Sequence, residues 1–160
     1  ALARYRAAGA ARLVRATLQR ARASAVSRAA NVAVRFVSTP AGIKFAVYAD
    51  ANRNGVSAAD IAGGIDVELE PLQSLTPFAG VAFGIGAGVV SPDGTPFGSP
   101  DPIRVGGASM VSFSPAGGAT SGTIYIAGAG GAQYAVRVYG DTGKTQLLRY
   151  LAGSRTWEAE

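Results

Sequence analysis

The chain has 160 residues, enough for one compact domain, and it contains no cysteine and no histidine. Disulfide bonds and thiolate metal sites are therefore excluded, and the commonest general base is missing, so we do not expect an enzyme. The charge is uneven: the first 49 residues hold nine bases and no acid, whereas the remainder holds six bases and ten acids, which divides the net charge of +5 into +9 and −4.

Residues 1–31 are predicted to form a long helix, because they are rich in alanine and no proline precedes Pro40. At about 100° per residue, small and apolar side chains fall on one stripe, on which Leu13, Val14 and Leu18 are the largest. We expect this stripe to pack against the rest of the molecule. It comprises Ala10, Leu13, Val14, Thr17, Leu18, Ala21, Ala25 and Ala29.

Arginines gather on the other side of the predicted helix, notably Arg4, Arg12, Arg15 and Arg22. Guanidinium groups suit phosphate oxygens, so one interpretation is contact with lipid headgroups or nucleic acid. The other interpretation is a solvated helix face, because no aromatic residue stands between Arg12 and Arg22 to stack on bases.

From residue 32 the hydrophobic pattern changes to alternation, which predicts β-strands. Residues 32–37 and 43–47 alternate on either side of a Pro-Ala-Gly turn and are predicted to form a hairpin. Turn-forming residues separate the other predicted strands, which are residues 65–69, 80–85, 110–113, 123–127, 134–139 and 145–151.

These elements predict an α+β fold in which a long N-terminal helix packs on antiparallel sheets of about seven to nine short strands. We expect a single domain over residues 1–160, with the helix at 1–31 and a β-rich head at 32–160. Residues 72–105 are rich in proline and glycine and lack clear periodicity, so they are expected to be irregular. Trp157 is expected to cover an edge of the core.

An acidic loop after the predicted hairpin resembles the beginning of a calcium-binding loop, in which oxygen ligands alternate and a glycine makes the sharp turn. The glutamate that would close such a loop is missing, because Ile61 occupies its position. The alternative is a metal-free turn, in which Ser57 or Asp60 caps a short turn. The candidate calcium ligands are Asp50, Asn52, Asn54, the carbonyl of Val56 and Asp60.

Three acids, Asp66, Glu68 and Glu70, alternate along the next predicted strand. Alternate residues of a strand point to the same side, so we expect these carboxylates to share one side of a sheet. A solvated side is the interpretation we favour over a catalytic carboxylate pair.

Three stretches carry a resemblance to a known family. Residues 12–28, RLVRATLQRARASAVSR, resemble a pilin-type helix that runs directly into a first strand. The FSPAG of residues 113–117 and the SGTIYI of residues 121–126 resemble a central element, and YAVRV, TGKT and LRY between residues 134 and 150 resemble a closing hairpin. In this order, which excludes about residues 72–105, they resemble the GspH/FimT group of minor pseudopilins of type II secretion and type IV pilus systems.

The resemblance implies a non-enzymatic filament subunit that acts in protein secretion or pilus assembly. It implies an apolar membrane helix of about 20 residues upstream of Ala1, which anchors the protein in the inner membrane with its head in the periplasm. The present fragment is then expected to be soluble. Other pilins or pseudopilins are the implied partners, and secreted proteins are further candidates.

One alternative function is DNA binding for DNA uptake. In FimT-like members a Gly-Arg-X-Arg motif in the closing hairpin is implicated in binding DNA, but residues 143–146 read GKTQ here. The DNA interpretation therefore depends on Lys144, Arg149 and Arg155, of which Lys144 offers a point charge rather than a guanidinium fork.

The other alternative is a secreted module that binds carbohydrate or another surface. Such a module would stack its ligand on exposed aromatic side chains, for which Tyr139 and Tyr150 are the candidates. The sequence leaves these three functions open.

Overall fold

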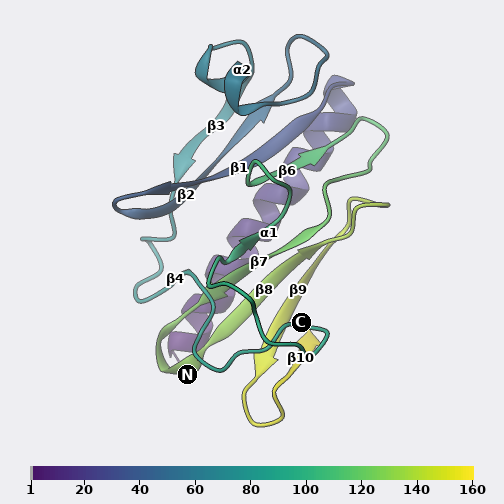
Figure 1. The fold of residues 1–160 in the computed structure, drawn as a ribbon. Coiled ribbons are helices and arrows are strands. Elements are labelled where there is room, and N and C mark those ends of the chain that lie inside the picture. The colour runs from purple at the N-terminus through teal and green to yellow at the C-terminus, as the bar shows by residue number, and fades with distance from the viewer. Residues whose placement is uncertain (1) are drawn as a thin grey trace.

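The structure is a computed structural model that describes residues 2–160. It places one long helix, α1 (Leu2–Arg28), against two antiparallel β-sheets. Figure 1 shows α1 running behind both sheets along most of the length of the molecule. The predicted α+β class, with a long N-terminal helix packed on antiparallel sheets, is therefore confirmed.

The end of α1 is set by its capping geometry. Ala29 adopts a left-handed backbone conformation, with φ of 53°. Its amide donates to the carbonyl of Val26, and the amide of Ala30 donates to the carbonyl of Ala25, which is the hydrogen-bond pattern of a Schellman cap. The expectation that Ala29 belongs to the buried stripe is wrong, because the helix has already ended and Ala29 is exposed.

The first sheet has four strands in the order β3-β2-β1-β6. The predicted hairpin is confirmed, with Thr39 and Gly42 as the last paired residues on either side of the turn. A short helix, α2, lies between β2 and β3 in the chain. The elements are β1 (Val32–Thr39), β2 (Gly42–Ala49), α2 (Ala58–Ala62), β3 (Val67–Gln73) and β6 (Met110–Phe113).

The second sheet has six strands, five of them in the order β10-β9-β8-β7-β4, with β5 also paired to β7. A single 3-10 turn, η1 (Ala129–Gly131), connects β7 to β8. The strands are β4 (Ala82–Phe83), β5 (Ile103–Arg104), β7 (Gly122–Ala127), β8 (Gln133–Val138), β9 (Thr145–Leu151) and β10 (Thr156–Ala159).

The predicted strands at residues 110–113 and 145–151 match β6 and β9, but two others differ. The strand predicted at 65–69 begins later, because the amides of Ile65 and Asp66 donate to the carbonyl of Asp60 and complete the end of α2. The strand predicted at 80–85 shortens to β4. The sequence did not predict β5, β10 or α2, and residues 2–160 contain ten strands in all.

Residues 72–105 are largely irregular, as expected, apart from the end of β3 and the short strands β4 and β5. Trp157 in β10 contacts this region, because its indole nitrogen donates a hydrogen bond to the carbonyl of Val90 at 2.8 Å. The Trp157 ring also packs against Tyr125 and Tyr150, with centroids 5.8 and 5.1 Å apart. Trp157 thus covers a small secondary cluster of the second sheet, apart from the main core.

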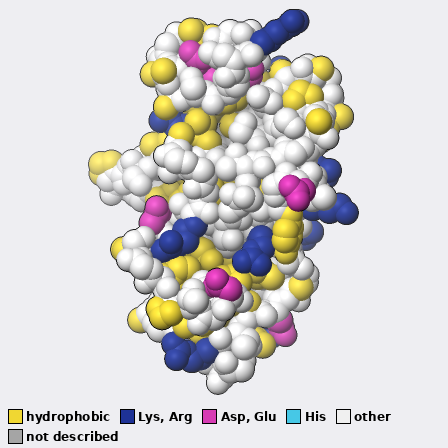
Figure 2. Space-filling view, turned by 45° about the vertical axis from the view of Figure 1, so that its right-hand side comes forward, with side chains coloured by type: hydrophobic (Ala, Val, Ile, Leu, Met, Phe, Trp, Pro, Cys, Tyr) yellow, Lys and Arg dark blue, Asp and Glu magenta, His cyan; other side chains and the backbone are white. Residues whose placement is uncertain are grey.

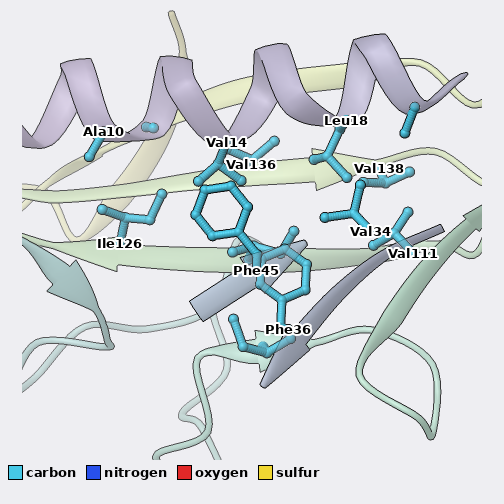
Figure 3. Packing of buried hydrophobic residues seen from close by; sticks show 14 of the residues in the cluster. Ala10, Val14, Leu18, Val34, Phe36, Phe45, Val111, Ile126, Val136 and Val138 are labelled. Atoms are coloured by element: carbon cyan, nitrogen blue, oxygen red, sulfur yellow. The ribbon is translucent and has the colours of Figure 1, made fainter. Parts of the chain in front are cut away.

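The main core lies between α1 and the two sheets. Figure 3 shows Val14 and Leu18 of α1 above Val136 and Val138 of β8, and both helix residues are completely buried. Leu13, the third large residue of the predicted stripe, is only partly buried against this core. The stripe continues toward the N-terminus in small residues that allow close approach of the second sheet, namely Ala7, Ala8, Ala10 and Ala11.

Candidate functional site

The arginines of α1 do not form one uniformly solvated face. Arg12 and Arg20 are exposed, whereas Arg15 and Arg22 are partly buried. Arg15 reaches the start of β9, where its Nε donates to Oγ1 of Thr145 at 3.3 Å. The helix therefore presents basic side chains toward its neighbours in the head as well as toward solvent.

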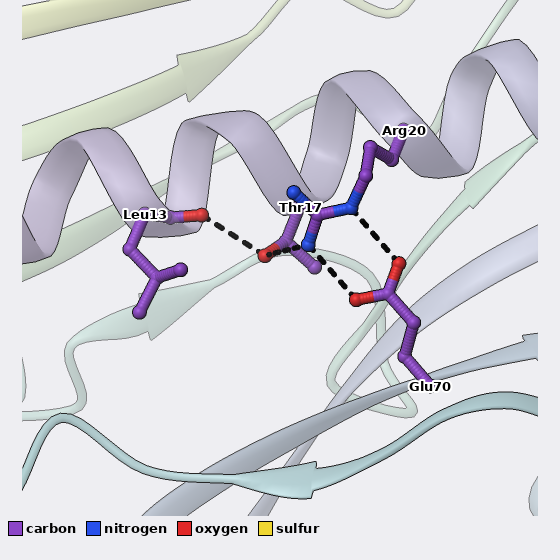
Figure 4. A network of polar contacts seen from close by, with 4 residues as sticks. All are labelled: Leu13, Thr17, Arg20 and Glu70. Atoms are coloured by element: carbon purple, nitrogen blue, oxygen red, sulfur yellow. Dashed lines mark hydrogen bonds and ion pairs between the residues drawn. The ribbon is translucent and has the colours of Figure 1, made fainter.

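Arg20 contacts the first sheet through a forked ion pair (Figure 4). Its Nε and Nη2 donate to the two carboxylate oxygens of Glu70 at 3.0 and 2.9 Å. Nη2 also donates to Oγ1 of buried Thr17, whose hydroxyl donates to the carbonyl of Leu13 at 2.9 Å. The hydrogen bond with Glu70 is the main reason that the pKa of Arg20 is raised above its usual value. This network joins α1 to β3.

The Arg20–Glu70 pair is expected to contribute modestly to stability. The two side chains are 50% and 28% exposed, so solvent screens them, although the forked geometry favours the pair. A double-mutant cycle with Arg20→Gln and Glu70→Gln should give a coupling free energy of about 0.2–1 kcal/mol in urea unfolding. Arg12→Gln combined with Glu70→Gln is the matched control and should show no coupling. A zero value for the Arg20 cycle would mean that the pair does not persist in solution.

The three alternating acids do not share a solvated side, so that expectation is wrong. Asp66 precedes β3 and is buried, and its carboxylate accepts a hydrogen bond from the amide of Ser57 at 3.0 Å. A shift of register in β3 then places Glu68 opposite Tyr48 and Glu70 opposite its neighbour Val47. The shift breaks the simple alternation and allows Glu70 to meet α1.

The predicted calcium loop is closed by its own hydrogen bonds. Asp50 accepts from the amides of Asn52 and Gly55, at 3.2 and 3.0 Å, which forms an Asx-type turn. Hydrogen bonds from Asn54 and Asn52 lower the pKa of Asp60, so its carboxylate keeps these bonds until the pH falls below the ordinary carboxyl range. Ser57 caps α2 by accepting from the amide of Asp60 at 3.1 Å.

Calcium binding at this loop stays a prediction. Within residues 2–160 no group of three or more acidic side chains is placed to hold a metal ion, so the ligands would have to include Asn52, Asn54 and the Val56 carbonyl. Calorimetric titration should give a heat of binding that Asp50→Ala removes. No heat at millimolar calcium would reject the site and leave the Asx turn.

The three cations behind the DNA interpretation are not brought together. Lys144 and Arg155 lie at opposite ends of β9, which runs between them. Arg149 is occupied by an ion pair with Glu158 of β10, at 2.7 Å, and Nη2 of Arg155 donates to the carbonyl of Gly88. On the face of the molecule that Figure 2 displays, basic side chains lie in separate groups, with acidic side chains between some of them.

The two tyrosines behind the carbohydrate interpretation are also separate. Tyr139 follows β8 and is 42% exposed, and its hydroxyl donates to the side chain of Gln146 at 2.7 Å. Tyr150 lies at the other end of the β8–β9 hairpin, where its ring packs on Trp157 and its hydroxyl is buried. They therefore do not form one aromatic platform.

The structure instead brings Lys144 together with Arg15 and Arg22, a grouping that the sequence does not predict. The three side chains line a groove of about 630 Å³ between α1 and the turn that joins β8 to β9. More than 100 residues separate the two arginines from Lys144 in the chain, so no local sequence pattern predicts that these side chains lie close together.

None of the helices within residues 2–160 combines the length and the apolar character needed to cross a membrane.

Comparison with known proteins identifies one family. The sequence profile of the family described as type II transport protein GspH matches residues 10–143 of the chain. The match includes most of α1, all of the first sheet and the second sheet up to the turn before β9. The chain matches no curated protein and no solved structure.

Proposed function

We propose that this chain acts as a minor pseudopilin, because it belongs to the GspH family of type II transport proteins. The role is structural: the subunit is incorporated into a short periplasmic filament and contacts neighbouring pseudopilins there. The observation that carries this proposal is the family match over most of the chain, which coincides with a long helix packed on a β-rich head.

The packing of α1 supports this role. A filament subunit must transmit the position of its helix to its head, which requires a rigid junction between them. Val14 and Leu18 are completely buried against the sheets, and Arg20 joins the helix to β3 on one flank. Arg15 joins it to β9 on the other flank. The head is therefore fixed to the helix on both sides.

The exposed part of α1 offers a surface for neighbouring subunits. Leu2 and Tyr5 are 58% and 73% exposed near the start of the helix, and no acid occurs before Asp50. In the full-length protein an apolar helix upstream of Ala1 would anchor the subunit in the inner membrane. Secreted proteins are further candidate partners of the head.

Deletion of the gene tests the proposed role. We expect exoproteins of the type II pathway to accumulate in the periplasm of the deletion strain, and the full-length gene to restore their secretion. Twitching motility and DNA uptake, measured in the same strains, separate secretion from the pilus functions. Normal secretion in the deletion strain would contradict the proposal.

Because the chain has no cysteine, a single introduced cysteine can report on assembly in cells. Full-length protein with Tyr5→Cys, labelled with a photoreactive maleimide, is expected to form adducts with other pseudopilins. Those adducts should vanish when the neighbouring pseudopilin genes are deleted. Adducts that persist unchanged in that strain would show that the exposed helix face contacts something else.

A further inference from the structure

The groove between α1 and the β8–β9 turn is lined by three basic side chains. Arg15 and Arg22 enter it from the helix and Lys144 enters it from the turn. Among the described residues that line it, no carboxylate is present to balance these three cations. The groove is therefore a positively charged hollow with one wall on the helix and one on the hairpin.

Arg22 is held in this hollow by packing rather than by a partner. Its side chain lies over Gly143, where an added Cβ would stand 3.0 Å from the Arg22 Nε. Its Nη2 lies close to Gly117 of the neighbouring loop. Within residues 2–160 the buried Nε of Arg22 has no hydrogen-bond partner, and no acid pairs with the guanidinium. A guanidinium without an acidic partner can bind an oxygen anion through the N–H groups other than the buried Nε.

The surroundings restrict the size of that anion. An adjacent hollow shares Arg15, Lys144 and Thr145 with the groove, but Asp141 and Glu160 also line it. A long polyanion such as nucleic acid would meet these carboxylates as it left the groove, and no aromatic side chain lines the groove to stack on bases. A compact negative charge avoids both problems.

The groove also has an apolar side. Val26 lines it and is 57% exposed, and Ala23 also lines it. A ligand that combines one or two carboxylates with an apolar side chain would match both the cations and this apolar wall. Short acidic segments of polypeptide have this composition.

We infer that the groove formed by Arg15, Arg22, Lys144 and Val26 is a docking site for a short acidic segment of a neighbouring polypeptide. The carboxylates bind Arg22 and Lys144, and an adjacent apolar side chain packs on Val26. The inference rests on the proposed function in one respect, since it takes the neighbour to be another subunit of the filament. It names the chemistry by which that neighbour is recognised.

Titration of the ¹⁵N-labelled 160-residue chain with the acetylated and amidated peptide Leu-Asp-Glu-Leu tests this inference by NMR. We expect saturable shifts of the amides of Gly143, Lys144 and Thr145 and of the helix around Arg22. The matched peptide Leu-Asn-Gln-Leu should give none. Arg22→Gln should weaken binding by about tenfold or more, as loss of one charge-assisted hydrogen bond requires.

Arg12→Gln is the matched control, because it removes the same charge from an exposed position of α1 outside the groove and should leave the affinity unchanged. Lys144→Met is the second test variant, for use if Arg22→Gln alters the fold. Equal losses in Arg12→Gln and Arg22→Gln would overturn the inference, as would equal binding of both peptides or no saturable shift at millimolar peptide.

Tighter binding of a short DNA duplex to the same amides would show that nucleic acid is the occupant and would also overturn the inference. The outcomes are separable from those of the secretion assay. Peptide binding together with normal secretion in the deletion strain would reject the pseudopilin role but support the groove as a site that binds acidic segments. Impaired secretion without peptide binding would support the pseudopilin role and reject the groove as a docking site for an acidic segment.

Discussion

The Leu18→Ala variant is expected to lose about 2–5 kcal/mol of the free energy of unfolding. Leu18 is completely buried and lies where α1 meets both sheets, close to Val34, Val111 and Val138 (Figure 3). Removal of its side chain leaves a cavity that the well-supported strands around it cannot close. For a chain of this size, thermal unfolding followed by circular dichroism should show a midpoint lower by about 5–15 °C.

Leu2→Ala is the matched control, because it makes the same chemical change in the same helix at a position that is 58% exposed. Its effect should stay within about 0.5 kcal/mol. Equal effects of the two substitutions would mean that α1 is not packed on the head in solution as the structure places it.

Gly143→Ala is expected to destabilise the protein by about 2–4 kcal/mol, because two costs act together. Gly143 has φ of 69°, a conformation that alanine adopts only with strain. An added Cβ would also overlap the carbonyl oxygen of Gly117 and press on the side chain of Arg22. The β8–β9 turn, the loop before β7 and α1 meet at this point, so none of them can move away alone.

Gly130→Ala separates the two costs. Gly130 has a nearly equal φ of 65°, but an added Cβ there would meet nothing within 4 Å. The free energy of unfolding of Gly130→Ala should therefore fall by about 1–2 kcal/mol, from backbone strain alone. Equal losses at the two glycines, measured by urea unfolding, would show that the three segments are not in close contact at Gly143.

The long helix and the hairpin of β1 and β2 could be predicted because their signals are local. A three-to-four-residue period over alanine-rich sequence specifies α1, and alternation around the Pro40 turn specifies the hairpin. The strand predicted at residues 65–69 was displaced because the chain first completes the turn of α2 through hydrogen bonds to Asp60. Whether residues 65 and 66 end α2 or begin the strand depends on backbone hydrogen bonds, which the pattern of side chains does not predict.

The contacts of the arginines could not be predicted, because each depends on residues distant in the chain. Arg20 meets Glu70 only after the register of β3 has shifted, and Arg22 meets Gly143 only after the closing hairpin has packed on the helix. Helical periodicity placed Arg15 and Arg22 outside the apolar stripe, but the structure leaves both side chains partly buried. The periodicity carried no information on what covers these side chains.

The arrangement of α1 across both sheets has a mechanical consequence. A force applied along the helix axis loads the contacts with both sheets at the same time. Under such a shear force all of these contacts must break at the same time, whereas a force that peels the helix away would break them one after another. Leu18 lies close to residues of both sheets (Figure 3). The Arg20–Glu70 pair adds a contact with the first sheet, and the Arg15–Thr145 hydrogen bond adds one with the second. The helix can therefore be pushed or pulled without peeling away from its head.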